Sequence, residues 1–205
     1  MVLQYVLFAI CGFISGSVMY SYLIAKHFYN VDITVEGSDG NPGMTNVMEC
    51  VGKKQGLVCL LLDWLKGFIP VFLACTKLDP SNKWFALVIV APVLGHAFSP
   101  MLKGKGGKAI AVTFGVFAGA LAAGSDMFWS LCVILIIFSA IIVIKPHSVR
   151  MIFSMIWQIV WCIVKRESLG LMFGGIFSSV IVIIKHVMNK DKEKAHVELP
   201  FKKFK

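Results

Sequence analysis

Long apolar segments recur along almost the whole chain and constrain its fold more than any other feature. Of the 205 residues, 58% are hydrophobic and only 15% are charged, and the mean hydropathy is +0.80. A soluble domain of this size would be roughly half apolar and about a quarter charged. The strands of a membrane barrel would be shorter and would alternate between apolar and polar residues. The sequence therefore predicts an all-α integral membrane protein.

The apolar pattern predicts a single bundle of seven transmembrane helices. Several segments are shorter than the roughly 20 residues that a helix perpendicular to the bilayer needs, and local thinning of the bilayer can accommodate them. The predicted spans cover residues 2–25, 55–76, 84–101, 109–124, 127–144, 149–164 and 168–186. We expect residues 1–189 to form the membrane domain and residues 190–205 to form a flexible basic cytoplasmic tail.

The positive charges predict the orientation of this bundle. If the N-terminus is outside, the cytoplasmic segments carry 15 of the 20 Lys and Arg residues, the outside loops carry 4, and Lys66 lies within a span. Lys and Arg concentrate on the cytoplasmic side of membrane proteins. We therefore expect the N-terminus outside and the C-terminus in the cytoplasm. Because the net charge of +9 lies beside membrane spans, it does not indicate nucleic-acid binding.

Small residues recur every four positions in three of the predicted spans. Such stripes let helix backbones approach closely in lipid, so we expect them to mark helix–helix contacts. They are Gly12 and Gly16; Ala111, Gly115, Gly119 and Ala123; and Gly170, Gly174 and Ser178.

Several polar or reactive residues inside the spans are expected to be structural. Asp63 and Lys66 are three residues apart on one helix face, and a charge at mid-bilayer costs about 2.5–3.5 kcal/mol on insertion scales. We expect them to neutralise each other and anchor their span, and a direct catalytic role is the alternative. His96 is expected to hold its loop in place. The six cysteines lack metal-binding spacing and are expected to be core residues.

Four polar segments lie on the predicted cytoplasmic side. Residues 95–108 combine glycines, three lysines and a histidine; exposed backbone N–H groups beside a lysine suit an anion such as phosphate. Residues 37–49 are rich in glycine, proline and asparagine, which predicts turns rather than helix. Residues 145–150 and 185–189 complete the group. Together they predict an anion-binding site; the alternative is that residues 95–108 form a basic loop that only fixes topology.

At these segments the sequence resembles the bacterial acyl-phosphate:glycerol-3-phosphate acyltransferases, the PlsY family. The resemblance runs in the same order over about residues 12–190, and the family also has seven spans with the N-terminus outside. The matching segments are residues 37–49 with the first family motif, 63–67 with its LLDxLKG sequence, 95–113 with its second motif, His186 and Asn189 with its terminal HxxN, and, weakly, Ser148 with a serine of its third conserved stretch.

Two residues depart from the family's first motif. Asp39 stands where the family usually has serine, with Ser38 displaced by one position, and Glu49 stands where it has arginine. A glutamate cannot supply the bidentate phosphate contact that an arginine gives. Either another cation (Lys53, Lys54 or Arg150) replaces the arginine, or the acceptor differs from glycerol-3-phosphate.

The resemblance implies transfer of a fatty acyl group from acyl-phosphate to the primary hydroxyl of glycerol-3-phosphate. The products would be lysophosphatidic acid and inorganic phosphate, in the first step of phospholipid synthesis. It also implies a multi-pass protein of the bacterial inner membrane whose active site faces the cytoplasm. No metal or other cofactor is expected. We expect a monomer whose partners are the two substrates and membrane lipids.

The resemblance and the side-chain chemistry together assign roles to the candidate site residues. His186 would deprotonate or orient the acceptor hydroxyl, with Asn189 beside it; alternatively, a phosphate oxygen takes the proton and His186 only binds. Lys108 is the third catalytic candidate, because it would stabilise charge on the departing phosphate. The residues assigned to acyl-phosphate are Gly106, Gly107, Lys108 and Lys105, and those assigned to the acceptor are Ser38, Asp39, Asn41, Thr45, Asn46 and Ser148.

A second hypothesis is a small transporter or a non-catalytic binder of phosphorylated metabolites. Transporters often contain internal repeats and carry polar residues near the bilayer midplane. This sequence shows no obvious repeat, and its polar residues gather on one side. These two features favour an enzyme that works at the membrane interface.

Overall fold

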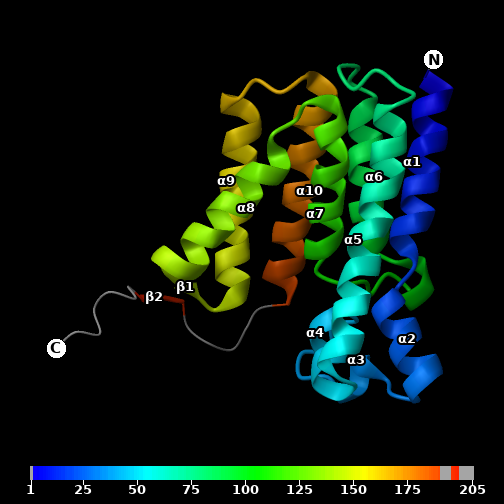
Figure 1. The fold of residues 1–205 in the computed structure, drawn as a ribbon, viewed down its shortest axis with the longest axis vertical. Helices are drawn as coiled ribbons and strands as arrows, with labels where there is room; N and C mark the ends of the chain where they lie inside the picture. The colour runs from blue at the N-terminus through cyan, green and yellow to red at the C-terminus, as the bar shows by residue number, and fades with distance from the viewer. Residues whose placement is uncertain (1, 190–194, 199–205) are drawn as a thin grey trace.

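The computed structural model describes residues 2–189 and 195–198, and its long helices run side by side along the longest axis of the molecule (Figure 1). The elements in chain order are α1 (Val2–Ser17), α2 (Tyr20–Tyr29), α3 (Ile33–Glu36), α4 (Met44–Cys50), α5 (Lys53–Cys75), α6 (Phe85–Ala97), the 3₁₀ helix η1 (Pro100–Leu102), α7 (Ile110–Gly119), the 3₁₀ helix η2 (Ala120–Ala123), α8 (Met127–Ile136), the π-helix η3 (Ile137–Ile141), β1 (Val143–Lys145), α9 (His147–Val164), α10 (Leu169–Met188) and β2 (His196–Glu198).

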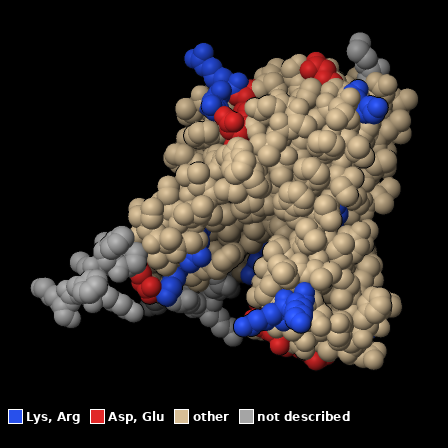
Figure 2. Space-filling view, viewed as in Figure 1, with Lys and Arg blue, Asp and Glu red and all other residues tan. Residues whose placement is uncertain are grey.

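Within the described residues, five helical segments are long and apolar enough to cross a membrane: α1 with α2, α5, α6 with η1, α9 and α10. The apolar segments α7–η2 and α8–η3 are shorter. On the face drawn in Figure 2, charged side chains gather toward the two ends of the molecule and leave a broad surface without charged residues between them. The predicted helical fold is thus confirmed apart from the short strands β1 and β2, whereas seven crossings remain a prediction.

The first predicted span is broken between α1 and α2, at Val18 and Met19. Backbone groups freed inside a membrane need partners from the protein. Ser99 Oγ donates a hydrogen bond to the Ser17 carbonyl at 2.6 Å, and Lys66 Nζ donates one to the Val18 carbonyl at 2.6 Å. The break is therefore stabilised by a loop and a helix that lie far from it in the sequence.

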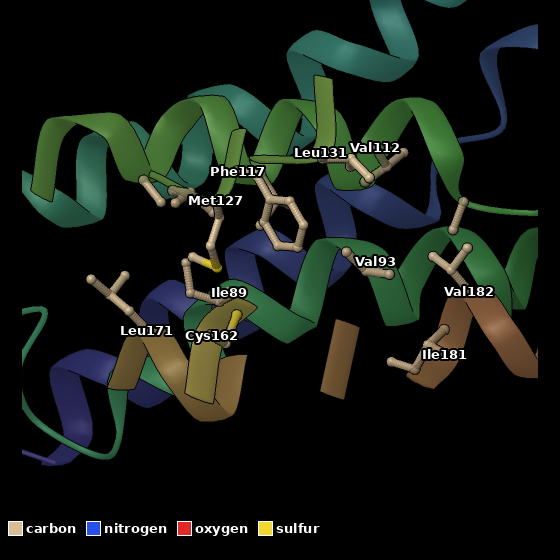
Figure 3. Packing of buried hydrophobic residues seen from close by; sticks show 14 of the residues in the cluster. Ile89, Val93, Val112, Phe117, Met127, Leu131, Cys162, Leu171, Ile181 and Val182 are labelled. Carbon is tan, nitrogen blue, oxygen red and sulfur yellow. The ribbon is translucent and has the colours of Figure 1, made fainter. Parts of the chain in front are cut away.

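The core lies where α6, α7, α8, α9 and α10 pack together (Figure 3). Small residues bring the backbones close: a Cβ at Gly16 would overlap the carbonyl of Pro92, and one at Gly115 would overlap the carbonyl of Trp64. The predicted role of the small-residue stripes is confirmed at these contacts. The buried side chains labelled in the figure are Ile89, Val93, Val112, Phe117, Met127, Leu131, Cys162, Leu171, Ile181 and Val182.

The prediction that residues 37–49 form turns was wrong in its second half. Residues 37–43 are irregular, with Gly40 at φ 65°, but Met44–Cys50 forms helix α4. No glycine or proline follows Gly43 until Gly52, so nothing in the sequence interrupts this helix.

The predicted helix at 127–144 was also too long. Helical structure ends at Ile141, and β1 pairs antiparallel with β2, with Val143 opposite Glu198. Strand β2 belongs to the segment predicted as a flexible tail. The rest of that segment, residues 190–194 and 199–205, lies outside the described residues, so the prediction of a flexible tail stays a prediction there.

Candidate anion-binding site at one end of the bundle

The polar segments meet at the end of the bundle opposite the N-terminus, where α3, α4, β1 and the last turn of α10 lie (Figure 1). Three contacts connect them. Lys185 Nζ lies 3.0 Å from the Gly106 carbonyl oxygen, and Lys108 Nζ lies 2.8 Å from Asp39 Oδ2. The rings of His147 and His186 lie 6.4 Å apart. The candidate site is therefore built from parts of the chain that are up to about 150 residues apart in sequence.

The central loop runs from η1 to the start of α7. It turns sharply, because Lys103 (φ 53°), Gly104 (φ 82°) and Ala109 (φ 62°) all adopt left-handed backbone conformations. The Gly104 N–H donates to the Ser99 carbonyl at 2.8 Å, which closes the first turn. This geometry leads the chain back over the end of α6.

His96 supports this loop from below, as predicted. The Gly107 N–H donates to the His96 carbonyl at 3.1 Å. A Cβ at Gly106 would overlap that carbonyl, and one at Gly107 would overlap the His96 ring. Glycine is needed at both positions for close approach, so the loop cannot be replaced by larger residues without moving away from α6.

The support continues into the bundle through Asp63 and Lys66. Lys66 Nζ lies 2.7 Å from Asp63 Oδ1, and their side chains are only 1% and 5% exposed. His96 Nδ1 lies 3.9 Å from the same carboxylate oxygen. The predicted pairing of Asp63 with Lys66 is confirmed, and the pair lies behind the loop and α6.

Lys185 lies in one of the four predicted polar segments, but no individual role was predicted for it. Its side chain is buried, its Nζ donates to the Gly106 carbonyl at 3.0 Å, and it lies 5.4 Å from the centroid of the Phe98 ring. In the sequence it counts as one positive charge at the end of a span, and nothing there indicates its contact with Gly106.

His186 is almost fully buried, and its Nδ1 lies 2.8 Å from the Val182 carbonyl oxygen. Because a carbonyl can only accept, Nδ1 carries the proton, and in the neutral ring Nε2 carries the lone pair. Ser148 is buried in the first turn of α9, next to His147. Asn189 is exposed and ends α10.

The loop before α4 faces the central loop through Asp39. Asp39 Oδ2 accepts from Lys108 Nζ at 2.8 Å, and Oδ1 accepts from Asn46 Nδ2 at 2.9 Å and from the Asn41 N–H at 3.0 Å. Burial would raise the pKa of Asp39, but the hydrogen bonds from Lys108, the Asn41 backbone and Asn46 lower it below its usual value of 3.8. The carboxylate is therefore ionised at neutral pH.

Other predicted residues are less engaged. Ser38, Thr45 and Lys105 are exposed, and in the described parts of the chain they have no side-chain hydrogen bond. Glu49 is exposed on α4. Arg150, which could replace the missing arginine, donates instead to the Ile144 carbonyl and to Ser139 Oγ.

Comparison with known proteins agrees with this geometry. Residues 6–195 match the family model described as glycerol-3-phosphate acyltransferase. The glycerol-3-phosphate acyltransferase of Thermotoga petrophila is 46% identical over 110 residues, 54% of this chain and 55% of that protein. The one of Clostridium acetobutylicum is 31% identical over 188 residues, 87% of this chain and 90% of that protein. The chain thus spans about half the length of the first relative and most of the second.

Two solved structures show the same fold. One is PlsY, an integral membrane glycerol 3-phosphate acyltransferase, in its glycerol 3-phosphate form, with a TM-score of 0.78 and 30% identity over 91% of this chain and 90% of that one. Its lysophosphatidic acid form gives a TM-score of 0.76 and 28% identity over 91% and 89%.

Fold and site first define a class: a helical integral membrane protein with a basic, glycine-lined site at one end of its bundle. Within that class, the chain belongs to the glycerol-3-phosphate acyltransferase family. Membership favours the enzyme over the transporter among the two hypotheses drawn from the sequence.

Proposed function

We propose that this protein transfers a fatty acyl group from acyl-phosphate to glycerol-3-phosphate and releases lysophosphatidic acid and inorganic phosphate. Two contacts at one end of a membrane bundle of this family carry the proposal: Lys185, next to His186 on α10, donates to the Gly106 carbonyl, and Lys108 pairs with Asp39. Such an end suits a substrate with an apolar tail in the bilayer and a phosphate at its surface.

The donor phosphate binds at the central loop. Gly106 and Gly107 line this site, with the Gly107 N–H donating to the His96 carbonyl, and Lys105 and Lys108 provide positive charge for the phosphate. As the acyl–phosphate bond breaks, its electron pair goes to the phosphate oxygen, and Lys108 stabilises the charge that develops there. Lys185 and His96 hold the loop in the conformation that this requires.

The acceptor binds on the α4 side, near Ser38, Asp39, Asn41, Thr45 and Asn46, with Ser148 supplied by α9. Its hydroxyl oxygen attacks the acyl carbon and loses a proton. His186 Nε2 takes that proton, and Asn189 lies at the end of the same helix. In the alternative, an oxygen of a substrate phosphate takes it and His186 only orients the hydroxyl.

Seven crossings, an outside N-terminus and a cytoplasmic site complete the proposal. The charge distribution of the sequence supports this orientation. The shorter segments α7–η2 and α8–η3 would then cross where the bilayer is locally thin.

The direct test supplies purified protein in detergent micelles with acyl-phosphate and radiolabelled glycerol-3-phosphate. Labelled lysophosphatidic acid and an equal amount of inorganic phosphate are expected. If neither forms while a known family member is active in parallel, the proposal fails. Acyl-coenzyme A in a separate reaction identifies the donor, and unphosphorylated glycerol tests the acceptor.

His186→Ala separates the two proton acceptors. If His186 is the general base, kcat falls about 10²- to 10⁴-fold and the shape of its pH profile changes. If a phosphate oxygen is the base, the pH profile keeps its shape. His27→Ala is the matched control, because His27 Nδ1 makes the same contact with the carbonyl four residues earlier, at 3.1 Å, on the exposed side of α2.

A further inference from the structure

Asp39 and Lys108 form an ion pair that joins two loops 69 residues apart in the sequence. Lys108 Nζ lies 2.8 Å from Asp39 Oδ2, with side chains 17% and 42% exposed. Lys108 is the lysine that the proposed function assigns to the donor phosphate. In the structure without substrate, this ammonium group already has an anion as its partner.

The carboxylate of Asp39 also accepts hydrogen bonds from residues that are assigned to binding of the acceptor. Its other oxygen accepts hydrogen bonds from Asn46 Nδ2 at 2.9 Å and from the Asn41 N–H at 3.0 Å. An ammonium, a side-chain amide and a backbone N–H around one anion form the kind of donor set that binds phosphate. Asp39 therefore contacts donors that a substrate phosphate would use.

A phosphate group and this carboxylate compete for Lys108. Both are negative, so bringing a phosphate to the ammonium while Asp39 stays bound places like charges within a few ångströms. The ion pair is partly open to water, and pairs of this kind are worth at most about 1 kcal/mol. Displacement of Asp39 by a phosphate group therefore costs little.

We propose that Asp39 sets the phosphate affinity of this site: it occupies Lys108 while the site is empty, and an incoming phosphate must displace it. The inference rests on the proposed function only in taking Lys108 as a phosphate ligand. Asp39 thereby lowers the affinity of the site for phosphate.

The test measures binding of inorganic phosphate to the full-length protein in detergent micelles by isothermal titration calorimetry. Asp39→Asn keeps the shape of the side chain and removes its charge. We expect it to bind phosphate about three- to fivefold more tightly than the unmodified protein, which is the range that loss of a partly exposed ion pair allows. The same substitution should increase the affinity for a monoanion such as formate by a smaller factor.

Asp32→Asn is the matched control. Asp32 lies in the same part of the chain and pairs with Lys26 at 2.8 Å, away from the central loop. Neutralising it changes the net charge equally, so phosphate affinity should stay within about twofold of the unmodified protein. An equal gain in both variants would show a general effect of net charge and overturn the inference.

Asp39→Ser provides a second neutral side chain, in case the asparagine disturbs the loop. Thermal unfolding identifies which variants are folded. Phosphate binding that is unchanged or weaker in the folded variants overturns the inference, as does the absence of phosphate binding in all of them. Acyl transfer is measured separately. If Asp39→Asn binds phosphate more tightly but the protein transfers no acyl group, only the proposed function fails. If the protein transfers acyl groups but Asp39→Asn leaves phosphate binding unchanged, only this inference fails.

Discussion

The protein contains two Asp–Lys pairs with almost the same contact distance and different settings. Asp63 and Lys66 lie 2.7 Å apart on one helix and are nearly inaccessible to water. Asp39 and Lys108 lie 2.8 Å apart on two loops and are partly exposed. The first pair lies within one turn of α5, and its lysine also binds the break after α1, whereas the second pair joins the loop before α4 to the central loop.

The two pairs consist of the same residue types and differ in their burial and in the segments that they join. A buried charge cannot exchange its partner for water, so Lys66 stays with Asp63 and the Val18 carbonyl in any state of the folded protein. The partly exposed pair can open toward solvent or toward a phosphate. The pairs thus show how one interaction stabilises the fold in one place and adjusts binding in another.

The largest effect is expected when the buried pair is broken. Lys66→Met leaves the Asp63 carboxylate buried without a counter-ion and frees the Val18 carbonyl, so the free energy of unfolding should fall by about 3–5 kcal/mol. Thermal unfolding in detergent measures this. Adding Asp63→Asn should recover part of the loss; a single variant as stable as the unmodified protein would contradict the assigned role of the pair.

Breaking the exposed pair from its lysine side should affect activity instead. Lys108→Ala removes a charge that stabilises the departing phosphate, and kcat/KM for acyl-phosphate should fall about 10²- to 10³-fold, as for other donors to a developing negative charge. Unfolding temperature should hardly change. Lys77→Ala, at an exposed lysine outside the four polar segments, is the control and should keep full activity.

Lys185 tests whether the loop between the two pairs needs its own support. Lys185→Met keeps the length of the side chain and loses the bond to the Gly106 carbonyl, so KM for acyl-phosphate should rise about tenfold, consistent with loss of a hydrogen bond from a charged group. KM for glycerol-3-phosphate should stay close to normal. Lys185→Arg should restore much of the activity, and equal changes in both KM values would argue for general damage.

The smallest effect is expected at the opposite end of the bundle. Lys165 Nζ lies 2.8 Å from Asp126 Oδ2, beside a cavity of about 560 Å³. The hydrogen bond that Lys165 donates to Asp126 raises the pKa of Lys165, so the pair persists below the usual lysine pKa and is lost only as the pH rises through the raised value. Lys165→Gln should leave both unfolding temperature and acyl transfer unchanged at neutral pH; a clear loss of activity would place a second functional site there.

The sequence was most informative about features that depend on residues close together in one segment. Uniform apolar runs identified the membrane helices, and the i, i+3 spacing identified the Asp63–Lys66 pair. Contacts between distant segments were harder to predict. Lys185 reaches Gly106 across 79 residues and Asp39 reaches Lys108 across 69, and no periodicity links them. Helix α4 was missed because the turn residues before it dominated the composition of its segment.

The break after α1 has a consequence for where the site can lie in the bilayer. Ser99, at the start of the central loop, donates to the Ser17 carbonyl, and Lys66 secures the next carbonyl of the break. The position of the central loop is therefore fixed relative to α1 and the far end of the protein, rather than relative to the lipid headgroups around it. A membrane that thickens or thins can move its own surface relative to the loop, while the loop keeps its distance from the protein's other end.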